Sequence, residues 1–132
     1  MTMASDLMGL GVSPLQAMKT ATGGVGPLTI LAAGTNFATG TKIGCSQYLV
    51  SCTNADGTRA LSLPTIGGDN GAFFADDFII NNATTGALNV YASTGVLISA
   101  QGTNSSKQIL SSHVTITLYP ISTTQWIGVA GT

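Results

Sequence analysis

The sequence predicts an all-β fold, an antiparallel β-sandwich or a small jelly-roll-like barrel, preceded by a short helical arm at the N-terminus. Runs rich in valine, isoleucine, threonine and aromatic residues recur at intervals of roughly 8–12 residues. Clusters of glycine, asparagine, aspartate and serine separate these runs, and the 132-residue chain contains 17 glycines. Within residues 114–118, apolar and polar residues alternate with the two-residue period of a strand. We assign residues 1–26 to the arm and residues 27–132 to one β-sandwich domain.

The arm combines an apolar stretch with the signals of a short helix. Ser13 can cap a helix that starts at Pro14, and Gly23-Gly24 can end it. A helix this short does not hold alone in water, so we expect the arm to dock on its own domain, on a sister subunit or on another protein. A mobile terminal tail is the alternative. The residues expected to make the contact are apolar: Leu7, Met8, Leu10, Val12, Leu15 and Met18.

Nine segments after the arm have the composition of strands. They are residues 27–32, 42–46 (or a neighbouring register), 47–52, 58–63, 78–82, 88–91, 96–99, 113–118 and 125–129. We expect residues 54–57, which end in Asp-Gly, and residues 84–86 to be hairpin turns that join the strands on either side. Residues 64–77 and 100–106 are expected to be loops.

Two of these strands have a clear inward face. Val114, Ile116 and Leu118 point the same way, and a register slip of one residue would expose all three side chains. In the strand at 88–91, Leu88 and Val90 point in one direction, while the residues between them point in the other. We therefore expect the strand that contains Val114, Ile116 and Leu118 to have a firmly set register.

Charged residues are unusually rare. They make up 7% of the chain, with a formal net charge of −1, whereas about a quarter is typical of a soluble domain. Weak self-repulsion favours close association with neighbours, which fits a component of an assembly. Lys19, Lys42, Arg59 and Lys107 are scattered along the chain, whereas a nucleic acid needs a clustered basic face. We therefore expect no nucleic-acid partner.

No segment is expected to cross a membrane or to direct export. The most apolar stretch, residues 25–33, contains Gly26 and Pro27, and a membrane span takes about 20 mostly apolar residues. Near the N-terminus, Asp6 stands where a signal peptide has basic residues, and Pro14 interrupts the apolar run. We therefore expect a protein that is made in the cytoplasm and is not exported by this route.

The sequence contains no catalytic motif. His113 is the only histidine, and we expect it at the start of a strand, since no Gly-x-Ser-x-Gly turn accompanies it. Asp76 and Asp77 would point to opposite faces of a strand, although in a loop they could bind calcium together with Asp69 and Asn70. A solvated turn is the favoured interpretation. We expect no enzyme activity, no cofactor and no metal.

The cysteines and the aromatic residues are expected to be structural. Cys45 and Cys52 would lie roughly 23 Å apart on an extended strand, so they can pair only if the chain folds back between them. Two reduced, buried thiols are the favoured interpretation. Trp126 is expected to fill the core or an interface. Alternatively, Trp126 and the three tyrosines could line a sugar site in a receptor-binding module.

Several short motifs resemble those of small β-rich structural proteins of tailed bacteriophages. They are Leu63-Pro64, residues 78–83 (Phe-Ile-Ile-Asn-Asn-Ala), 87–91 (Ala-Leu-Asn-Val-Tyr), 95–98 (Gly-Val-Leu-Ile) and 122–126 (Ser-Thr-Thr-Gln-Trp). Residues 6–11, followed by Ser13-Pro14, also look like the start of many such proteins. The resembling proteins include capsid decoration, or cement, proteins and modules of tail and fibre proteins. Their pattern often has proline and asparagine where this chain has Ala92 and Ser99.

The resemblance implies a structural role without catalytic residues. The leading expectation is a capsid decoration protein that stabilises the phage head by bridging capsid subunits, on the capsid surface of the virion. Its partners would be the major capsid protein and copies of itself, with a homotrimer favoured. The alternative is a tail, fibre or receptor-binding module that contacts a glycan on the host surface.

Overall fold

The computed structural model describes residues 28–45, 47–67, 71–74 and 76–131. Within these ranges the chain forms strands and connecting turns and no helix, which confirms the all-β class. The strands are β1 (Leu28–Ile30), β2 (Thr41–Lys42), β3 (Leu49–Cys52), β4 (Ala60–Ser62), β5 (Phe78–Asn82), β6 (Leu88–Tyr91), β7 (Leu97–Ala100), β8 (Thr103–Ser105), β9 (Lys107–Leu110), β10 (Thr115–Ser122) and β11 (Gln125–Gly131). No helix long and apolar enough to cross a membrane is found in the described residues. The predicted helical arm lies outside them.

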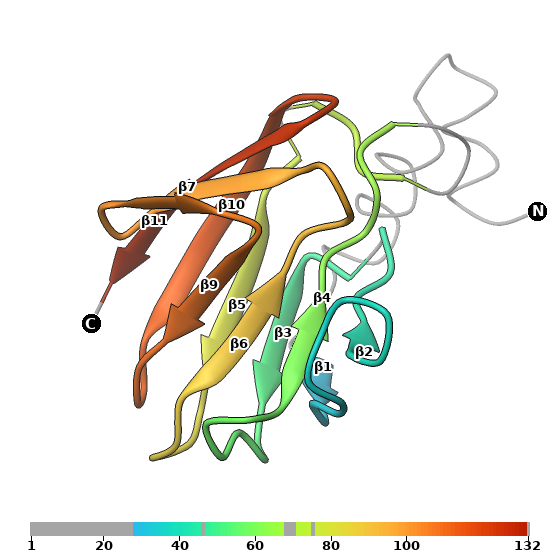
Figure 1. Cartoon of the computed structure of the whole chain (residues 1–132). Coiled ribbons are helices and arrows are strands. Elements are labelled where there is room, and N and C mark those ends of the chain that lie inside the picture. The colour runs from blue at the N-terminus through green and yellow to red at the C-terminus, as the bar shows by residue number, and fades with distance from the viewer. Residues whose placement is uncertain (1–27, 46, 68–70, 75, 132) are drawn as a thin grey trace, which may run out of the picture.

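The strands form two sheets that face each other across a common core (Figure 1). The seven-stranded sheet has the order β1-β3-β5-β10-β11-β7-β8, and the four-stranded sheet has the order β2-β4-β6-β9. Each sheet ends in two edge strands, so the described strands do not close into a barrel. Both sheets contain parallel as well as antiparallel pairs. The expectation of a purely antiparallel sandwich is therefore wrong.

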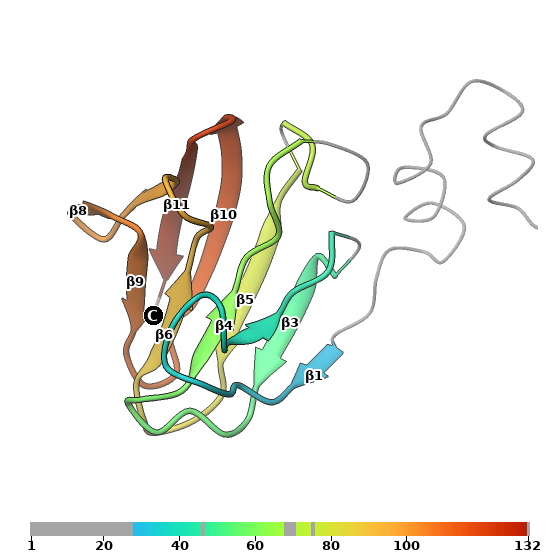
Figure 2. The same ribbon diagram turned by 45° about the vertical axis from the view of Figure 1, so that its right-hand side comes forward.

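The first six strands wind between the two sheets. β1, β3 and β5 lie side by side in parallel in one sheet, and β2, β4 and β6 do the same in the other. The chain thus changes sheet after each of these strands (Figure 2), as in the coils of a solenoid. Residues 54–57 and 84–86 make turns within this winding, but each joins strands of different sheets. The predicted hairpins are therefore wrong, because each strand pairs with the preceding coil.

The later strands add antiparallel pairs. β9 pairs with β6, β10 pairs with β5, and β11 returns beside β10. β7 and β8 form a hairpin whose two turn residues, Gln101 and Gly102, have φ values of 52° and 77°, as a type I′ turn requires. β8 lies within the stretch predicted as a loop, and β9 was not predicted. Their short, mostly polar sequences carry little of the hydrophobic period that identifies a strand.

The core contains the inward side chains of both sheets. Its largest fully buried members include Trp126, Phe78, Leu61, Leu63, Ile80, Leu88, Ile98, Leu110, Ile116 and Leu118. The rings of Phe78 and Trp126 meet edge to face, with a centroid distance of 5.5 Å. The predicted inward positions of Ile116 and Leu118 are confirmed, as are those of Leu88 and Val90. Val114 is only partly buried, because β10 begins one residue after it.

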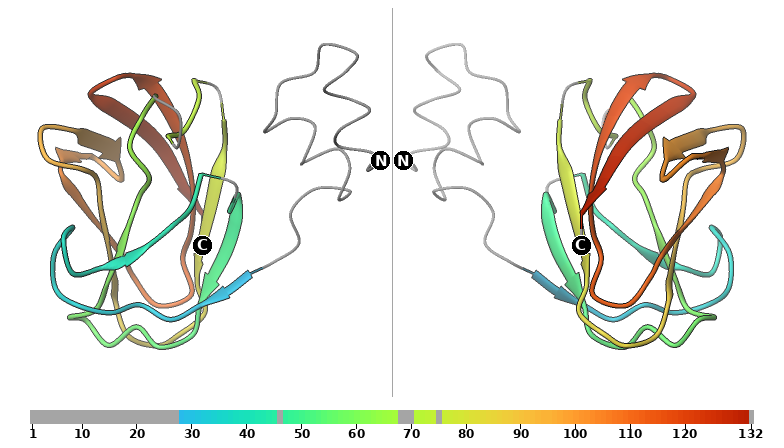
Figure 3. Two further views of the ribbon diagram at one scale, coloured as in Figure 1. Left: turned by 90° about the vertical axis from the view of Figure 1, so that its right-hand side faces the viewer. Right: turned by 90° about the vertical axis from the view of Figure 1, so that its left-hand side faces the viewer.

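Residues 34–40 fold across the outer face of the four-stranded sheet. The Ser62 hydroxyl donates to the Phe37 carbonyl at 2.7 Å, and all three residues of β4 are buried. A Cβ on Gly40 would lie 2.6 Å from the Ser62 Oγ, so glycine is what lets this loop approach the sheet so closely. In both views of Figure 3 the loop, coloured blue to cyan, lies on the side away from β3 and β5. The protein thus covers part of one outer sheet face with its own chain.

Candidate functional site

The apolar arm residues predicted to contact a partner lie outside the described residues. These are Leu7, Met8, Leu10, Val12, Leu15 and Met18. Their docking stays a prediction, as do the domain boundaries at residues 26 and 27. The candidate site that the structure does describe is therefore on the β body.

His113 lies in an exposed turn before β10. Its backbone has a φ of 57°, and its N–H donates to the carbonyl of Thr84 at 3.2 Å. The prediction that this residue begins a strand is wrong, because a left-handed backbone interrupts the extended conformation and β10 begins at Thr115. Within the described ranges, no group of three or more His, Cys, Asp or Glu side chains is placed to hold a metal ion.

Asp76 and Asp77 lie in the connection before β5. The Asp76 carboxylate accepts a hydrogen bond from the backbone N–H of Phe73 at 3.0 Å, which is a local turn contact. The other two residues of the possible calcium site, at positions 69 and 70, are outside the described ranges. Burial, reinforced by Asp76, Cys45 and Asp77, raises the pKa of Tyr48 to about 12. The carboxylates of Asp76 and Asp77 thus contribute to the raised pKa of a core tyrosine.

The cysteines and Trp126 have structural positions. Cys45 and Cys52 are both free, as expected; Cys52 is buried, whereas Cys45 is only partly buried. Trp126 is fully buried, which confirms its interpretation as a core residue and removes it from any exposed sugar-binding platform. Its indole N–H has no hydrogen-bond partner among the described residues. Tyr91 is half-buried, and its hydroxyl donates to the Thr35 carbonyl at 2.9 Å.

Buried polar side chains fix the connections between strands. The Asn82 amide donates to the carbonyls of Gly86, Leu110 and Ser111 at 2.7, 3.1 and 3.1 Å, so it ties the end of β5 to its own turn and to the end of β9. The Gln108 amide donates to the Ile98 carbonyl at 2.9 Å, which links β9 of one sheet to β7 of the other. Such bonds, made away from water, favour a single arrangement of the two sheets.

The outer face of the seven-stranded sheet carries a set of apolar side chains. It consists of Leu49, Ile79, Leu97, Tyr119, Ile127 and Val129, which we call the outer apolar face. Register places Leu49 opposite Ile79, and both Ile79 and Val129 opposite Thr117. Tyr119 lies opposite Ile127, and Leu97 opposite Gln125 of the same strand as Ile127. The face therefore extends over five adjacent strands.

The outer apolar face is solvent-accessible and uncharged. The exposed fractions of Leu97, Ile127 and Val129 are 39%, 39% and 69%, while its other members are half-buried. No outward position of β3, β5, β7, β10 or β11 holds a charged residue. A polar row borders it, in which Asn81 donates to the Ser51 hydroxyl at 3.0 Å. Sequence reasoning missed this face, although apolar neighbours such as Ile79-Ile80 and Trp126-Ile127 indicate strands that are apolar on both sides.

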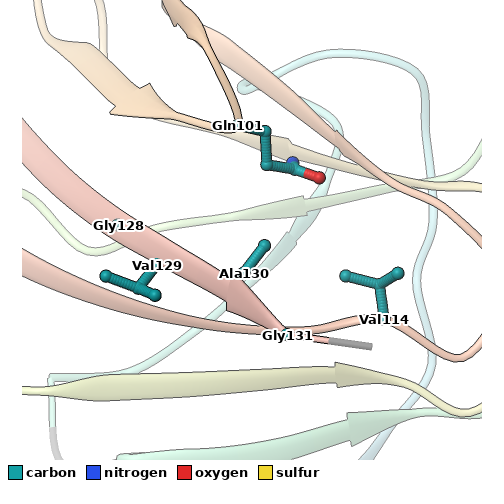
Figure 4. A pocket seen from close by; sticks show the side chains of 6 residues that line it. All are labelled: Gln101, Val114, Gly128, Val129, Ala130 and Gly131. Carbon is teal, nitrogen blue, oxygen red and sulfur yellow. The ribbon is translucent and has the colours of Figure 1, made fainter.

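A shallow hollow opens beside the end of β11. It is lined by Gln101, Val114, Gly128, Val129, Ala130 and Gly131 (Figure 4). The Gln101 amide already donates to the Gln108 side-chain oxygen at 3.3 Å and to the Ile109 carbonyl at 3.1 Å. This amide braces the β7–β8 hairpin against β9, and we assign no ligand to the hollow.

Comparison of the chain with protein-family models, with curated proteins and with solved structures finds no match. The resemblance to phage structural proteins therefore stays an interpretation of the sequence motifs.

Proposed function

We propose that this protein is a structural protein of a bacteriophage particle, namely a capsid decoration protein that stabilises the head by bridging capsid subunits. The motifs that resemble phage proteins include the β5 and β6 strands. In this role residues 1–26 contact the major capsid protein, and the β body spans the joint between neighbouring subunits. Copies of the chain associate on the capsid surface, where the resemblance favours a trimer.

The observation that carries the proposal is the bracing of the β body. Asn82 and Gln108 are buried, and each is hydrogen-bonded to segments distant from it in the chain. The two sheets also share one continuous core. Because a closely packed interior has low compressibility, such a body transmits load between neighbours with little deformation. A subunit that reinforces a pressurised head needs this property.

The sparse charge also supports a role in an assembly. Of the charged side chains in the described ranges, Arg59 and Asp56 form an ion pair with each other at 3.2 Å. The Asp56 carboxylate also accepts hydrogen bonds from Thr58, which lower the pKa of that carboxyl. A surface with little net charge has weak self-repulsion, so neighbouring subunits can pack closely.

Binding to heads tests the proposal. The purified full chain is mixed with empty heads of the phage that encodes it, and the heads are sedimented. We expect saturable binding with a fixed number of copies per capsomer. If the chain sediments with tails and not with heads, or with neither, the proposal is wrong.

A further inference from the structure

The two outer sheet faces differ in how far other described residues cover them. The loop at residues 34–40 covers part of the outer face of the four-stranded sheet, where the Ser62 hydroxyl and the Tyr91 hydroxyl both donate to its carbonyls. The outer apolar face of the seven-stranded sheet has no such cover among the described residues, and its member Val129 is 69% exposed. An apolar sheet face of this kind is an interaction surface.

The chemistry of the outer apolar face suits a copy of itself. A face with no charged side chain brings no like charges together when it meets its own duplicate. The polar row beside it is partly paired within itself, since Thr115 donates to Asn81 at 3.1 Å and Asn81 donates to Ser51. These groups therefore lose few bonds to water on contact. A charged or strongly polar partner would leave its own groups without complementary ones on this face.

The area fits a weak, reversible pair. Five strands spaced about 4.8 Å apart, each about five residues long, present roughly 400 Å² on each copy. Two such faces would bury about 800 Å², which is the size of a weak, transient protein interface. The association is therefore expected to depend on concentration in the micromolar range.

We propose that the outer apolar face binds the same face of a second copy, so that two seven-stranded sheets pack against each other. Such a self-complementary contact has two-fold symmetry and produces a pair. Ile127 lies between β10 and β7, opposite Tyr119 and Ser99, and Val129 lies two residues further along β11, opposite Thr117 of β10. The inference stands on the geometry of the β body and does not depend on the proposed phage function.

Sedimentation velocity of the full chain tests this pairing. The protein is studied from about 1 to 200 µM, a range that brackets micromolar association. The variant Val129→Lys places a charge on the outer apolar face. The matched control Ile109→Lys places the same charge on the opposite outer face, where Ile109 is 49% exposed. Ile127→Lys serves as a second face variant if Val129→Lys does not fold, with circular dichroism as the folding check.

We expect the native chain to reach twice its mass of 13.3 kDa as the concentration rises. Either face variant should weaken the pair at least ~10-fold, while Ile109→Lys leaves it intact. A native chain that stays monomeric over the whole range would overturn the proposal. So would a pair or a larger oligomer that persists in the folded face variants, or one that Ile109→Lys disrupts equally.

Discussion

At the residue scale, Asn82 shows how one buried side chain substitutes for several backbone partners. Its amide nitrogen serves three carbonyls, and its oxygen accepts bonds from the backbone N–H and the hydroxyl of Thr84 at 3.1 and 2.7 Å. The turn at 84–86 belongs to a connection between sheets, so no cross-strand ladder holds it. The Asn82 side chain therefore supplies the hydrogen bonds that the turn of a hairpin would receive from the neighbouring strand.

We predict that Asn82→Ala lowers the free energy of unfolding by about 1–3 kcal/mol, because it removes a buried amide that donates to the carbonyls of Gly86, Leu110 and Ser111. The adjacent Asn81 is the matched control, since its amide bonds to Ser51 on the half-buried outer face. Water can replace that bond, so Asn81→Ala should cost less than about 1 kcal/mol. Urea unfolding of both variants measures the difference, and equal losses would contradict this role of Asn82.

The raised pKa of Tyr48 predicts that the stability of the folded protein depends on pH at high pH. Burial, with Asp76, Cys45 and Asp77 nearby, raises its pKa to about 12, above the ordinary value of 10.0. Between these two values the phenol ionises in the unfolded chain and stays neutral in the folded one. The stabilisation from the neutral phenol is therefore complete below pH 10 and is lost as the pH rises toward 12.

We predict that one of the three tyrosines titrates about two pH units later than an ordinary phenol in an absorbance titration of the folded protein. Tyr48→Phe should remove this late step and reduce the loss of stability between pH 10 and 12. Titration of all three phenols together near pH 10 would contradict the burial of the Tyr48 side chain.

At the element scale, the β7–β8 hairpin depends on the backbone of Gly102. Its φ is 77°, and a Cβ at this position would meet no atom within 4 Å, so only the backbone conformation disfavours a side chain. We predict that Gly102→Ala costs about 1–2 kcal/mol in thermal or urea unfolding. Gly131→Ala is the control, since it also has open space and has no left-handed backbone. A similar cost at both positions would argue against this explanation.

The sequence predicted elements better than it predicted their partners. The strands at residues 78–82 and 88–91 were predicted with the same first and last residues as β5 and β6, because apolar runs there end at asparagine, threonine and glycine. Their pairing was not predicted, because β5 aligns with β3 across a connection longer than 20 residues, and no local turn signal marks a parallel contact. The hairpin at Gln101-Gly102 was missed, since glutamine seldom occupies a left-handed position.

The two candidate contact surfaces, the N-terminal arm and the outer apolar face, also differ in how far the sequence predicted them. The arm was predicted as a contact surface because its apolar residues are too numerous for a solvated tail, and its docking stays a prediction. The outer apolar face was not recognised, because Ile79 and Ile127 alternate with core residues and read as part of the same buried run. Which side of a doubly apolar strand faces solvent depends on the layer that covers it, and that layer is set by the tertiary fold.

At the scale of the whole molecule, two sheets share one core, and among the described residues a loop covers part of one outer face. In the roles proposed above, the contact surfaces are the outer apolar face and the apolar N-terminal segment. We therefore predict that residues 1–20 can be deleted without loss of the β body. The circular dichroism spectrum and the cooperative thermal unfolding of residues 21–132 should match those of the full chain.

Head binding by residues 21–132, compared with the full chain, tests the proposed role most directly. We predict that the full chain saturates empty phage heads at a fixed number of copies per capsomer, and that the folded, truncated chain binds at least ~10-fold more weakly. Equal binding by the two chains, or binding by neither, would contradict a decoration protein that attaches through its arm.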